Sequence, residues 1–277
     1  MIKPKFAVLI DLSGTLFIDD AAIPGAVTAL KTLLDNPLFA VKFVTNTTKE
    51  SVPNLLKRLH HVGFSYISQE QVFTSLTSAR NLVEARSLKP MLLLEPEAIG
   101  EFEGIQSDAT GVPQSDLNAV VVGLAPSQFH FERLNSAFRL LHANSDAVLI
   151  GIHKGRYYQR KDGLALGPGP FVAGLEYVSG RKAIVVGKPE QEFFQNAIRT
   201  LPSTFSPENV VMIGDDVNDD VLGSNAIGYK SILVKTGKYR NGDEENITSL
   251  PTAFVFPSVV EAISEILKNG GVVFGSA

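Results

Sequence analysis

The stretch VLIDLSGTLF, residues 8–17, runs consecutive apolar residues directly into Asp11 and then reaches a glycine. Consecutive apolar residues are typical of a strand that is covered on both faces, as in a parallel sheet. In open parallel sheets, ligands bind beyond the carboxyl ends of the strands, so a carboxylate that ends such a strand is a candidate functional group. Asp before Ser-Gly is also a common turn former, and the stretch alone leaves both interpretations open.

Similar apolar runs recur along the chain, and each is followed by a stretch with helical spacing. This alternation predicts the α/β class, with a doubly wound, mainly parallel, Rossmann-like core sheet. Turn-forming Gly, Asn and Asp residues fall between the predicted elements, and no fixed-period repeat interrupts the pattern. The runs are FAVLID, VKFVTN, MLLLE, NAVVVGL, AVLIGIH, AIVVGKP, NVVMIGDD and SILVKTG.

The composition is that of an ordinary globular protein, with 44% apolar and 19% charged residues in a chain of 277. A formal net charge of -4 argues against nucleic acid or an anionic membrane as a partner. The absence of cysteine excludes disulfides, thiol catalysis and thiolate metal sites. The apolar run near the N-terminus is too short for a signal peptide or a membrane span, so we expect a cytosolic protein with no membrane partner.

Polar residues end several of the predicted strands. Carboxylates, a lysine and hydroxyl or amide groups that meet at one sheet edge suit a dianion and a divalent cation. Asp11 and Asp215 offer hard oxygen ligands to Mg2+, and Lys188 can pair with a phosphate. Thr47 and Glu50 fit a capping box, which predicts a helix that begins there and points free amides at an anion. The residues at the strand ends are Asp11, Thr45, Asn46, Lys188, Asp215 and Asp216.

Each of these features has a simpler interpretation when it is taken alone. Lys188 precedes Pro189, and a lysine in such a position is more often a solvated loop residue. The stretch GDDVNDD, residues 214–220, suggests a calcium loop, but it has no glycine at loop position six and no glutamate at position twelve, so an EF-hand is excluded. The occurrence of four such features in chain order favours one shared site.

The segment 79–181 has predicted strands and helices of its own, which indicates an insert in a discontinuous domain. The predicted division is residues 1–78 for the first part of the core, 79–181 for the insert and 182–277 for the second part of the core. The insert contains a loop, HKGRYYQRKDGLALGPGPF, residues 153–171. Its basic run with tyrosines has three interpretations: nucleic-acid contact, a solvated loop, or a loop that faces the site.

The motifs resemble those of the haloacid dehalogenase-like hydrolases. DLSGT, VTN, the lysine of VGKP and GDDVNDD stand in the order of that family's four motifs, and the insert resembles its type II α/β cap. The resemblance covers nearly the whole chain. It implies a Mg2+-dependent phosphatase for a small phosphorylated substrate or a phospho-amino acid, and a homodimer is the assembly expected by analogy with the family.

The resemblance assigns the catalytic and metal-binding roles. It makes Asp11 the nucleophile, which forms an aspartyl-phosphate that water then hydrolyses. It places Mg2+ between the carboxylates of Asp11 and Asp215 and the backbone carbonyl of Ser13. Asp216 or Asp220 would act on the cation through water.

The resemblance also assigns the groups that bind the substrate. Lys188 would neutralise negative charge at the phosphoryl group, and the basic loop of the cap would meet the rest of the substrate. The predicted substrate-binding residues are Thr45, Asn46, Thr47, Lys188, Lys154 and Arg156.

Ser13 departs from the family pattern, because the phosphatases usually carry a second aspartate there. That aspartate protonates the leaving group and then activates water, which a serine cannot do near neutral pH. A positioned general acid or base contributes roughly 10²- to 10⁴-fold, so we predict a slower enzyme. Its best substrates would be activated compounds whose leaving group needs no proton: aryl phosphates, pyrophosphate, acyl phosphates and phosphoramidates.

Two other function classes stay open at this point. One is a regulatory protein that binds phosphate and Mg2+ with little or no catalysis, as the loss of the usual acid at Ser13 suggests. The other is a phospho-acceptor receiver domain, although receivers are much shorter and place the acceptor on a later strand. The intact Asp11, Lys188 and Asp215 favour catalysis over binding alone.

Overall fold

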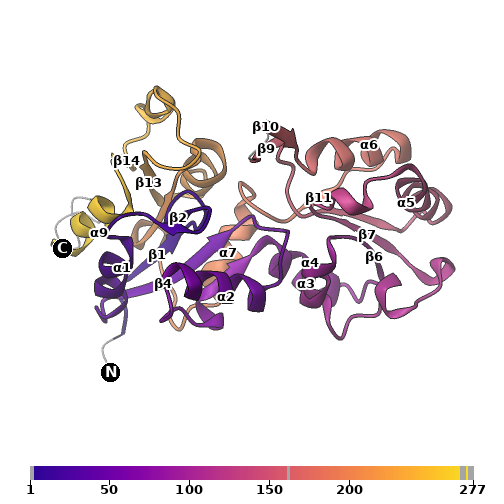
Figure 1. Cartoon of the computed structure of the whole chain (residues 1–277), viewed down its shortest axis with the longest axis horizontal. Helices are drawn as coiled ribbons and strands as arrows, with labels where there is room; N and C mark the ends of the chain where they lie inside the picture. Colours follow the sequence, from indigo (N-terminus) through magenta and orange to yellow (C-terminus); the bar gives the residue numbers. More distant parts are fainter. Residues whose placement is uncertain (1–2, 161–162, 269–272, 274–277) are drawn as a thin grey trace. The chain divides into compact units, whose positions relative to one another are not determined.

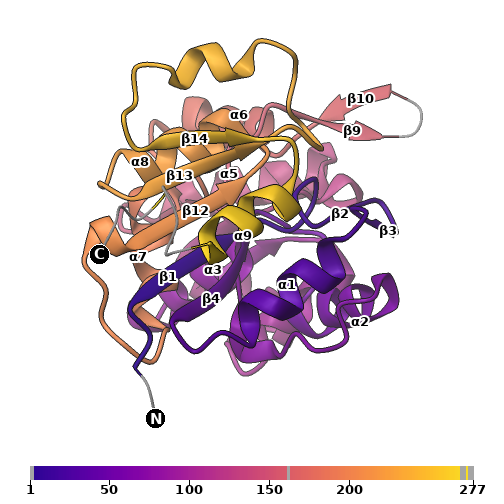
Figure 2. The same cartoon turned by 90° about the vertical axis from the view of Figure 1, so that its left-hand side faces the viewer.

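The central strand of the chain, β1 (Phe6–Ile10), pairs in parallel with β4 on one side and with β12 on the other. It belongs to a six-stranded sheet in the order β14-β13-β12-β1-β4-β5, and Figure 2 shows the strands from β14 to β4 in succession. The strand pairs between β14 and β4 are all parallel. The other strands are β4 (Phe39–Thr45), β5 (Val72–Thr74), β12 (Val210–Gly214), β13 (Lys230–Val234) and β14 (Ala253–Phe256).

The computed structural model describes residues 3–160, 163–268 and 273, and the chain divides in it into two units. The first unit contains Met1–Thr45, Leu55–Phe73 and Lys188–Ala277, and the second contains Asn46–Asn54 and Thr74–Gly187. The second unit thus begins earlier and ends later than the predicted insert at residues 79–181. That this unit is a cap domain stays a prediction.

Helices cover both faces of the six-stranded sheet. Alternate residues of β1, Ala7 and Leu9, pack in one cluster with Phe193 and Phe194 of α7. Helices α1 and α9 contact one another and lie in front of the sheet in Figure 2. This arrangement confirms the predicted α/β class with a mainly parallel sheet. The helices are α1 (Ala26–Leu34), α7 (Gln191–Arg199), α8 (Gly223–Asn225) and α9 (Val259–Leu267).

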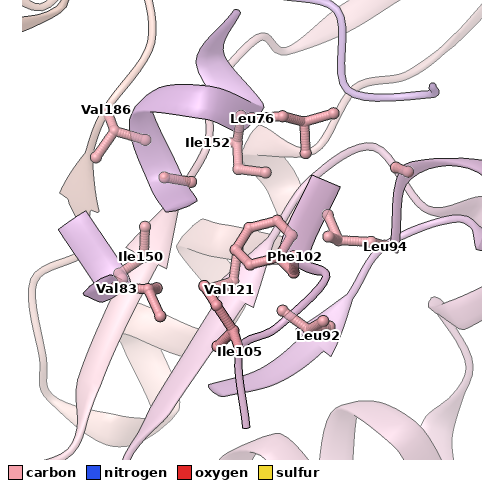
Figure 3. Close-up of a cluster of buried hydrophobic side chains, with 12 residues drawn as sticks. Leu76, Val83, Leu92, Leu94, Phe102, Ile105, Val121, Ile150, Ile152 and Val186 are labelled. Atoms are coloured by element: carbon pink, nitrogen blue, oxygen red, sulfur yellow. The ribbon is translucent and has the colours of Figure 1, made fainter. Parts of the chain in front are cut away.

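The second unit is built on a four-stranded parallel sheet in the order β11-β8-β7-β6. Side chains alternate along its strands, so Val121 faces one cluster, shown in Figure 3, and Val120 faces the other. Helix α3 covers the first face, and α5 and α6 cover the second (Figure 1). The elements are α3 (Ser75–Ala85), β6 (Pro90–Leu93), α4 (Pro96–Ile99), β7 (Ala119–Val122), α5 (Phe131–Ala143), β8 (Val148–Gly151), α6 (Gly169–Ser179) and β11 (Ile184–Val185).

The helix predicted at Thr47 begins later, so that prediction is wrong. Helix α2 runs over Val52–Val62. The amide of Val52 donates to Oε2 of the buried Glu101 at 3.1 Å, and this carboxylate therefore takes the capping role. Thr48, inside the predicted first turn, instead accepts a hydrogen bond from the Leu124 amide at 3.0 Å.

The basic stretch predicted as a loop contains an antiparallel hairpin, β9 (Tyr157–Arg160) with β10 (Gly163–Leu166). Gly163 has φ 126°, which favours glycine where the chain enters β10. Lys161, the last residue of the basic run, lies outside the described residues. A second hairpin, in the first unit, joins β2 (Phe17–Ile18) to β3 (Ala21–Ala22).

Short helices complete the structure. No helix within the described ranges is both long and apolar enough to cross a membrane. The short elements are the 3₁₀ helices η1 (Gln69–Gln71), η2 (Gly100–Phe102), η3 (Asp108–Thr110), η4 (Gln114–Asp116), η5 (Pro126–Gln128), η6 (Pro207–Asn209) and η8 (Asp243–Ile247), and the π-helix η7 (Val217–Leu222).

Candidate active site

Asp11 directly follows the buried central strand of the six-stranded sheet. Its amide donates to the carbonyl of Ile213 at 2.8 Å, which continues the ladder between β1 and β12 by one residue. Its side chain is buried, and the hydroxyl of Thr15 donates to Oδ2 at 3.3 Å. The strand and this turn therefore fix a carboxylate at the carboxyl edge of the sheet, as the sequence predicted.

Lys188 lies between two carboxylates. Its Nζ is 2.6 Å from Oδ1 of Asp11 and 2.6 Å from Oδ1 of Asp220, and its side chain is only 3% exposed. Burial opposes the charge of Lys188, but the two carboxylates outweigh it and raise the pKa above its ordinary value. Gly214 leaves the space for Asp220, because a Cβ at this glycine would stand 2.2 Å from Oδ2 of Asp220.

Three buried carboxylates come together here, from Asp11, Asp215 and Asp220, each with an oxygen within 4.8 Å of the others. Burial, and next the charge of Asp11, raise the pKa of Asp215 to about 7. Burial also raises the pKa of Asp220 well above its ordinary value, against the opposite effect of Lys188. The ammonium of Lys188 contacts two of these carboxylates, those of Asp11 and Asp220. The three carboxylates together form a set of hard oxygen atoms that can hold a divalent cation.

Asp216 is engaged elsewhere. Its Oδ1 accepts hydrogen bonds at 2.9 Å from the amides of Asn218 and Asp219 and so caps the start of η7. Its Oδ2 lies 3.0 Å from Nζ of Lys238. Burial disfavours its charge, but Lys238 and these amides outweigh burial and hold the pKa of Asp216 below its ordinary value. Its predicted action on a metal through water stays a prediction.

Ser13 has an exposed side chain, and the peptide that follows it is held in place. The amide of Gly14 donates to the carbonyl of Phe17 at 2.7 Å. Gly14 has φ 95°, a conformation that favours glycine. The structure therefore fixes the backbone around the predicted carbonyl ligand while leaving the serine hydroxyl in solvent.

The predicted phosphate-binding residues fall in both units. Thr45 ends β4 and is buried, and the register that pairs Ile10 with Phe43 puts it at the same edge as Asp11. Asn46 and Thr47 follow β4 along the chain and belong to the second unit. Their contact with a phosphoryl group stays a prediction.

The two basic residues predicted to meet the substrate lie in the second unit. Nζ of Lys154 forms an ion pair at 2.7 Å with Glu176, and this hydrogen bond lowers the pKa of Glu176 below its ordinary value. The guanidinium of Arg156 lies 5.8 Å from the ring centre of Tyr157. Both side chains are accessible enough to bind an anion, and their role in substrate binding stays a prediction.

Sequence reasoning missed the segment that follows β13. The backbone amide of Lys238 donates to Oδ2 of Asp215 at 2.6 Å, and the hydroxyl of Thr236 donates to the carbonyl of Gly14 at 2.5 Å. The signal was present, because the residues of this segment end a predicted strand just as Asp11 does. The segment contacts the site through a hydroxyl and a backbone amide, and neither group stands out in the sequence as an acid or base.

Comparison with known families and proteins places the chain among related sequences. Residues 8–105 match a family model described as haloacid dehalogenase-like hydrolase, and residues 185–262 match one described as HAD-hydrolase-like. The chain is 55% identical over 263 residues to haloacid dehalogenase-like hydrolase domain-containing protein 2 of Rattus norvegicus, covering 94% of this chain and 96% of the relative. These matches confirm the resemblance drawn from the four motifs.

A second relative and a solved structure agree with this placement. Phospholysine phosphohistidine inorganic pyrophosphate phosphatase of Danio rerio is 35% identical, over 97% of this chain and 96% of the relative. The crystal structure of a 4-nitrophenylphosphatase from Thermotoga maritima is similar with a TM-score of 0.81 and 26% identity, over 94% of this chain and 97% of that one.

Proposed function

Since this chain belongs to the haloacid dehalogenase-like hydrolase family, we propose that it is a Mg2+-dependent phosphatase that works through an aspartyl-phosphate on Asp11. The observation that carries the proposal is the buried ion pair of Asp11 with Lys188, next to Asp215 and Asp220. A purely structural pair would gain nothing from two further carboxylates, which repel Asp11 and one another. Such clusters of groups with shifted pKa values are typical of functional sites.

The reaction would take two steps. An oxygen of Asp11 attacks phosphorus, and the bond from phosphorus to the leaving group breaks, so that the leaving group departs with the electron pair. Water then attacks the phosphorus of the acyl phosphate, the bond from phosphorus to Asp11 breaks, and inorganic phosphate and a proton are released. Lys188 keeps Asp11 in a fixed orientation throughout and offsets part of the negative charge.

The donor set fits a divalent cation. Mg2+ takes oxygen ligands and uses one or two carboxylates, and the three carboxylates present supply these within 4.8 Å of one another. We propose that Asp11, Asp215 and the backbone carbonyl of Ser13 hold the cation, and that Asp220 or Asp216 acts through water. When bound, the cation stabilises the charge on the phosphoryl oxygens.

Ser13 narrows the proposed substrates. Its exposed hydroxyl is no acid near neutral pH, so bonds to good leaving groups should be cleaved fastest. Aryl phosphates, pyrophosphate, acyl phosphates and phosphoramidates meet this requirement. The name of the Danio rerio relative is consistent with this class, because phospholysine and phosphohistidine contain phosphorus–nitrogen bonds and pyrophosphate contains a phosphoanhydride.

The second unit is proposed to act as a cap that binds a small phosphorylated substrate or a phospho-amino acid. Thr45, Asn46 and Thr47 would hold the phosphoryl oxygens, and Lys154 and Arg156 would contact the rest of the substrate. Closure of such a cap excludes water and can limit turnover. A cytosolic location and a homodimer stay predictions alongside this one.

The first experiment measures phosphate release from p-nitrophenyl phosphate, whose aryl leaving group needs little protonation. We expect turnover by the wild-type protein in Mg2+, its loss in EDTA, and a decrease of at least about 1,000-fold for Asp11→Asn. Asp35→Asn is the matched control, since Asp35 is an exposed partner of Lys31 and should leave turnover unchanged. Turnover that persists in Asp11→Asn would contradict the proposed nucleophile.

A second candidate function rests on Ser13 alone: a protein that binds phosphate and Mg2+ without useful turnover. Wild type and Asp11→Asn, compared in the same assay, distinguish this binding function from the phosphatase. A folded wild-type protein that binds Mg2+ but releases phosphate no faster than Asp11→Asn would favour the binding function. A preference for sugar phosphates over aryl phosphates or phosphoramidates would be consistent with a phosphatase but would contradict the proposed substrate class.

A further inference from the structure

The segment Thr236–Lys238, directly after strand β13, touches two separate parts of the candidate site. Thr236 contacts the turn after Asp11, and Lys238 contacts Asp215. The motifs assign no role to these residues. The side chain of Lys238 forms an ion pair with Asp216, whereas its backbone amide and the Thr236 hydroxyl make the contacts to Asp215 and to the turn. All the atoms concerned belong to the first unit of the chain.

The first contact fixes the turn after Asp11. The hydroxyl of Thr236 donates to the carbonyl of Gly14 at 2.5 Å, across 222 positions of sequence. The amide of Gly14 donates to the carbonyl of Phe17 at 2.7 Å, so the peptide units on both sides of Gly14 are held. Because the C=O and N–H of a trans peptide point in opposite directions, the bond to Phe17 also sets the direction of the Ser13 carbonyl.

The second contact fixes Asp215. The backbone amide of Lys238 donates to Oδ2 of Asp215 at 2.6 Å, a hydrogen bond to a charged acceptor. This oxygen also fits between two glycines, because a Cβ at Gly14 or at Gly237 would stand 2.0 or 2.1 Å from it. Both glycines have positive φ, 95° and 57°, so neither position suits a larger residue.

We propose that Thr236 is a positioning residue, which holds the Ser13–Gly14 turn beside the Asp215 carboxylate that the Lys238 amide orients. The inference rests on the proposed function, because that arrangement matters only if both groups bind a cation. The Thr236 hydroxyl holds the turn that follows Asp11. The Lys238 amide orients the Asp215 carboxylate, whose Oδ2 packs against Gly14 of that turn. Groups that orient metal ligands in this way commonly account for about 10- to 100-fold in metal affinity or activity.

The test compares Thr236→Val with Thr236→Ser. Valine keeps the branched shape and removes the donor, whereas serine keeps the donor. Thr200→Val is the matched control, since its hydroxyl also donates to a backbone carbonyl, that of Ala197 at 2.7 Å, away from the carboxylates. Mg2+ affinity is measured directly by calorimetry, thermal unfolding in EDTA reports the fold, and kcat and KM are measured with p-nitrophenyl phosphate.

We expect Thr236→Val to bind Mg2+ about 10- to 100-fold more weakly, with a lower kcat and an unchanged KM. Thr236→Ser should stay within a few-fold of wild type in both Mg2+ affinity and kcat. Thr200→Val should match wild type in Mg2+ affinity. Equal Mg2+ affinity and kcat in Thr236→Val and wild type would overturn the inference while leaving the phosphatase intact. A wild-type protein that binds Mg2+ without turnover would instead overturn the phosphatase, and calorimetry of Thr236→Val would still decide the role of Thr236. A wild-type protein with no Mg2+ binding would overturn both.

Discussion

The side-chain amine of Lys188 lies 2.6 Å from Oδ1 of Asp11, although 177 positions separate the two residues along the chain. The same amine lies 2.6 Å from Oδ1 of Asp220, and all three side chains are buried. One cation thus holds two carboxylates that come from different elements. Removing one member of a buried pair leaves an uncompensated charge, so this contact should matter for stability as well as for catalysis.

Lys188→Met should therefore lower both the free energy of unfolding and the turnover. We expect a loss of about 3 kcal/mol or more from the buried carboxylates left without their cation, and a decrease in kcat of at least about 100-fold. Urea denaturation in EDTA and p-nitrophenyl phosphate hydrolysis measure the two effects. Lys31→Met, which breaks the exposed pair with Asp35, should cost under about 1 kcal/mol. Similar losses in the two variants would contradict the special role of the buried pair.

Ser13→Asp should restore a general acid at the position where the family usually has one. The exposed Ser13 side chain leaves room for the longer aspartate. We expect kcat/KM for an alkyl phosphate, such as glycerol phosphate, to rise relative to p-nitrophenyl phosphate, by up to about 10²- to 10⁴-fold. The ratio of the two kcat/KM values measures the effect. An unchanged ratio in a variant that still hydrolyses the aryl ester would mean that Ser13 does not limit the substrate range.

Asp216→Asn should have a smaller effect on Mg2+ affinity than Asp215→Asn, because the oxygens of Asp216 already accept from two amides and face Lys238. Asparagine can keep the cap of η7, whereas Asp216→Ala should lower the free energy of unfolding by about 1 kcal/mol. Calorimetry with Mg2+ and urea denaturation separate the two properties. Equal losses of Mg2+ affinity in Asp216→Asn and Asp215→Asn would instead support the metal role predicted for Asp216.

The metal-free protein should become more stable when Asp215 loses its charge. Burial and Asp11 raise the pKa of Asp215 from 3.8 to about 7, so the folded protein binds a proton that the unfolded chain has already released between these pH values. The free energy of unfolding therefore falls as pH rises from about 4 to about 7. Asp215→Asn removes this decrease in the free energy of unfolding. We therefore expect the variant to be more stable than wild type at pH 8, and by a larger margin than at pH 5.

Urea denaturation in EDTA at the two pH values tests this expectation. The same variant should lose Mg2+ affinity, so stability and metal binding should change in opposite directions. Asp35→Asn is the control for the loss of an exposed carboxylate, since Asp35 pairs only with its helix neighbour Lys31 among the ion pairs of the described residues. If wild type is more stable than Asp215→Asn at pH 8, the charge of Asp215 is compensated in the metal-free state.

Much of the fold was predictable because its signals are local. All eight apolar runs form strands, from β1 to β13, since a strand covered on both faces needs consecutive apolar side chains. Two strands of the six-stranded sheet were missed, β5 (Val72–Thr74) and β14 (Ala253–Phe256), which stand at its two ends and are short. Their few residues carry too little pattern to distinguish them from loops.

The sequence by itself determined the α/β class and the pair Asp11 and Asp215, because the parallel strands β1 and β12 put their carboxyl ends at one edge of the six-stranded sheet. Lys188 instead follows β11, a strand of the four-stranded sheet, so only the tertiary structure decided that its amine lies beside Asp11. Only the tertiary structure decided that Asp216 turns to Lys238, and that Thr236 holds Gly14 across 222 positions. A hydrogen bond between residues so far apart leaves no periodicity in the sequence. Its partners are chosen by the packing of whole elements, and that choice exists only once the chain has folded.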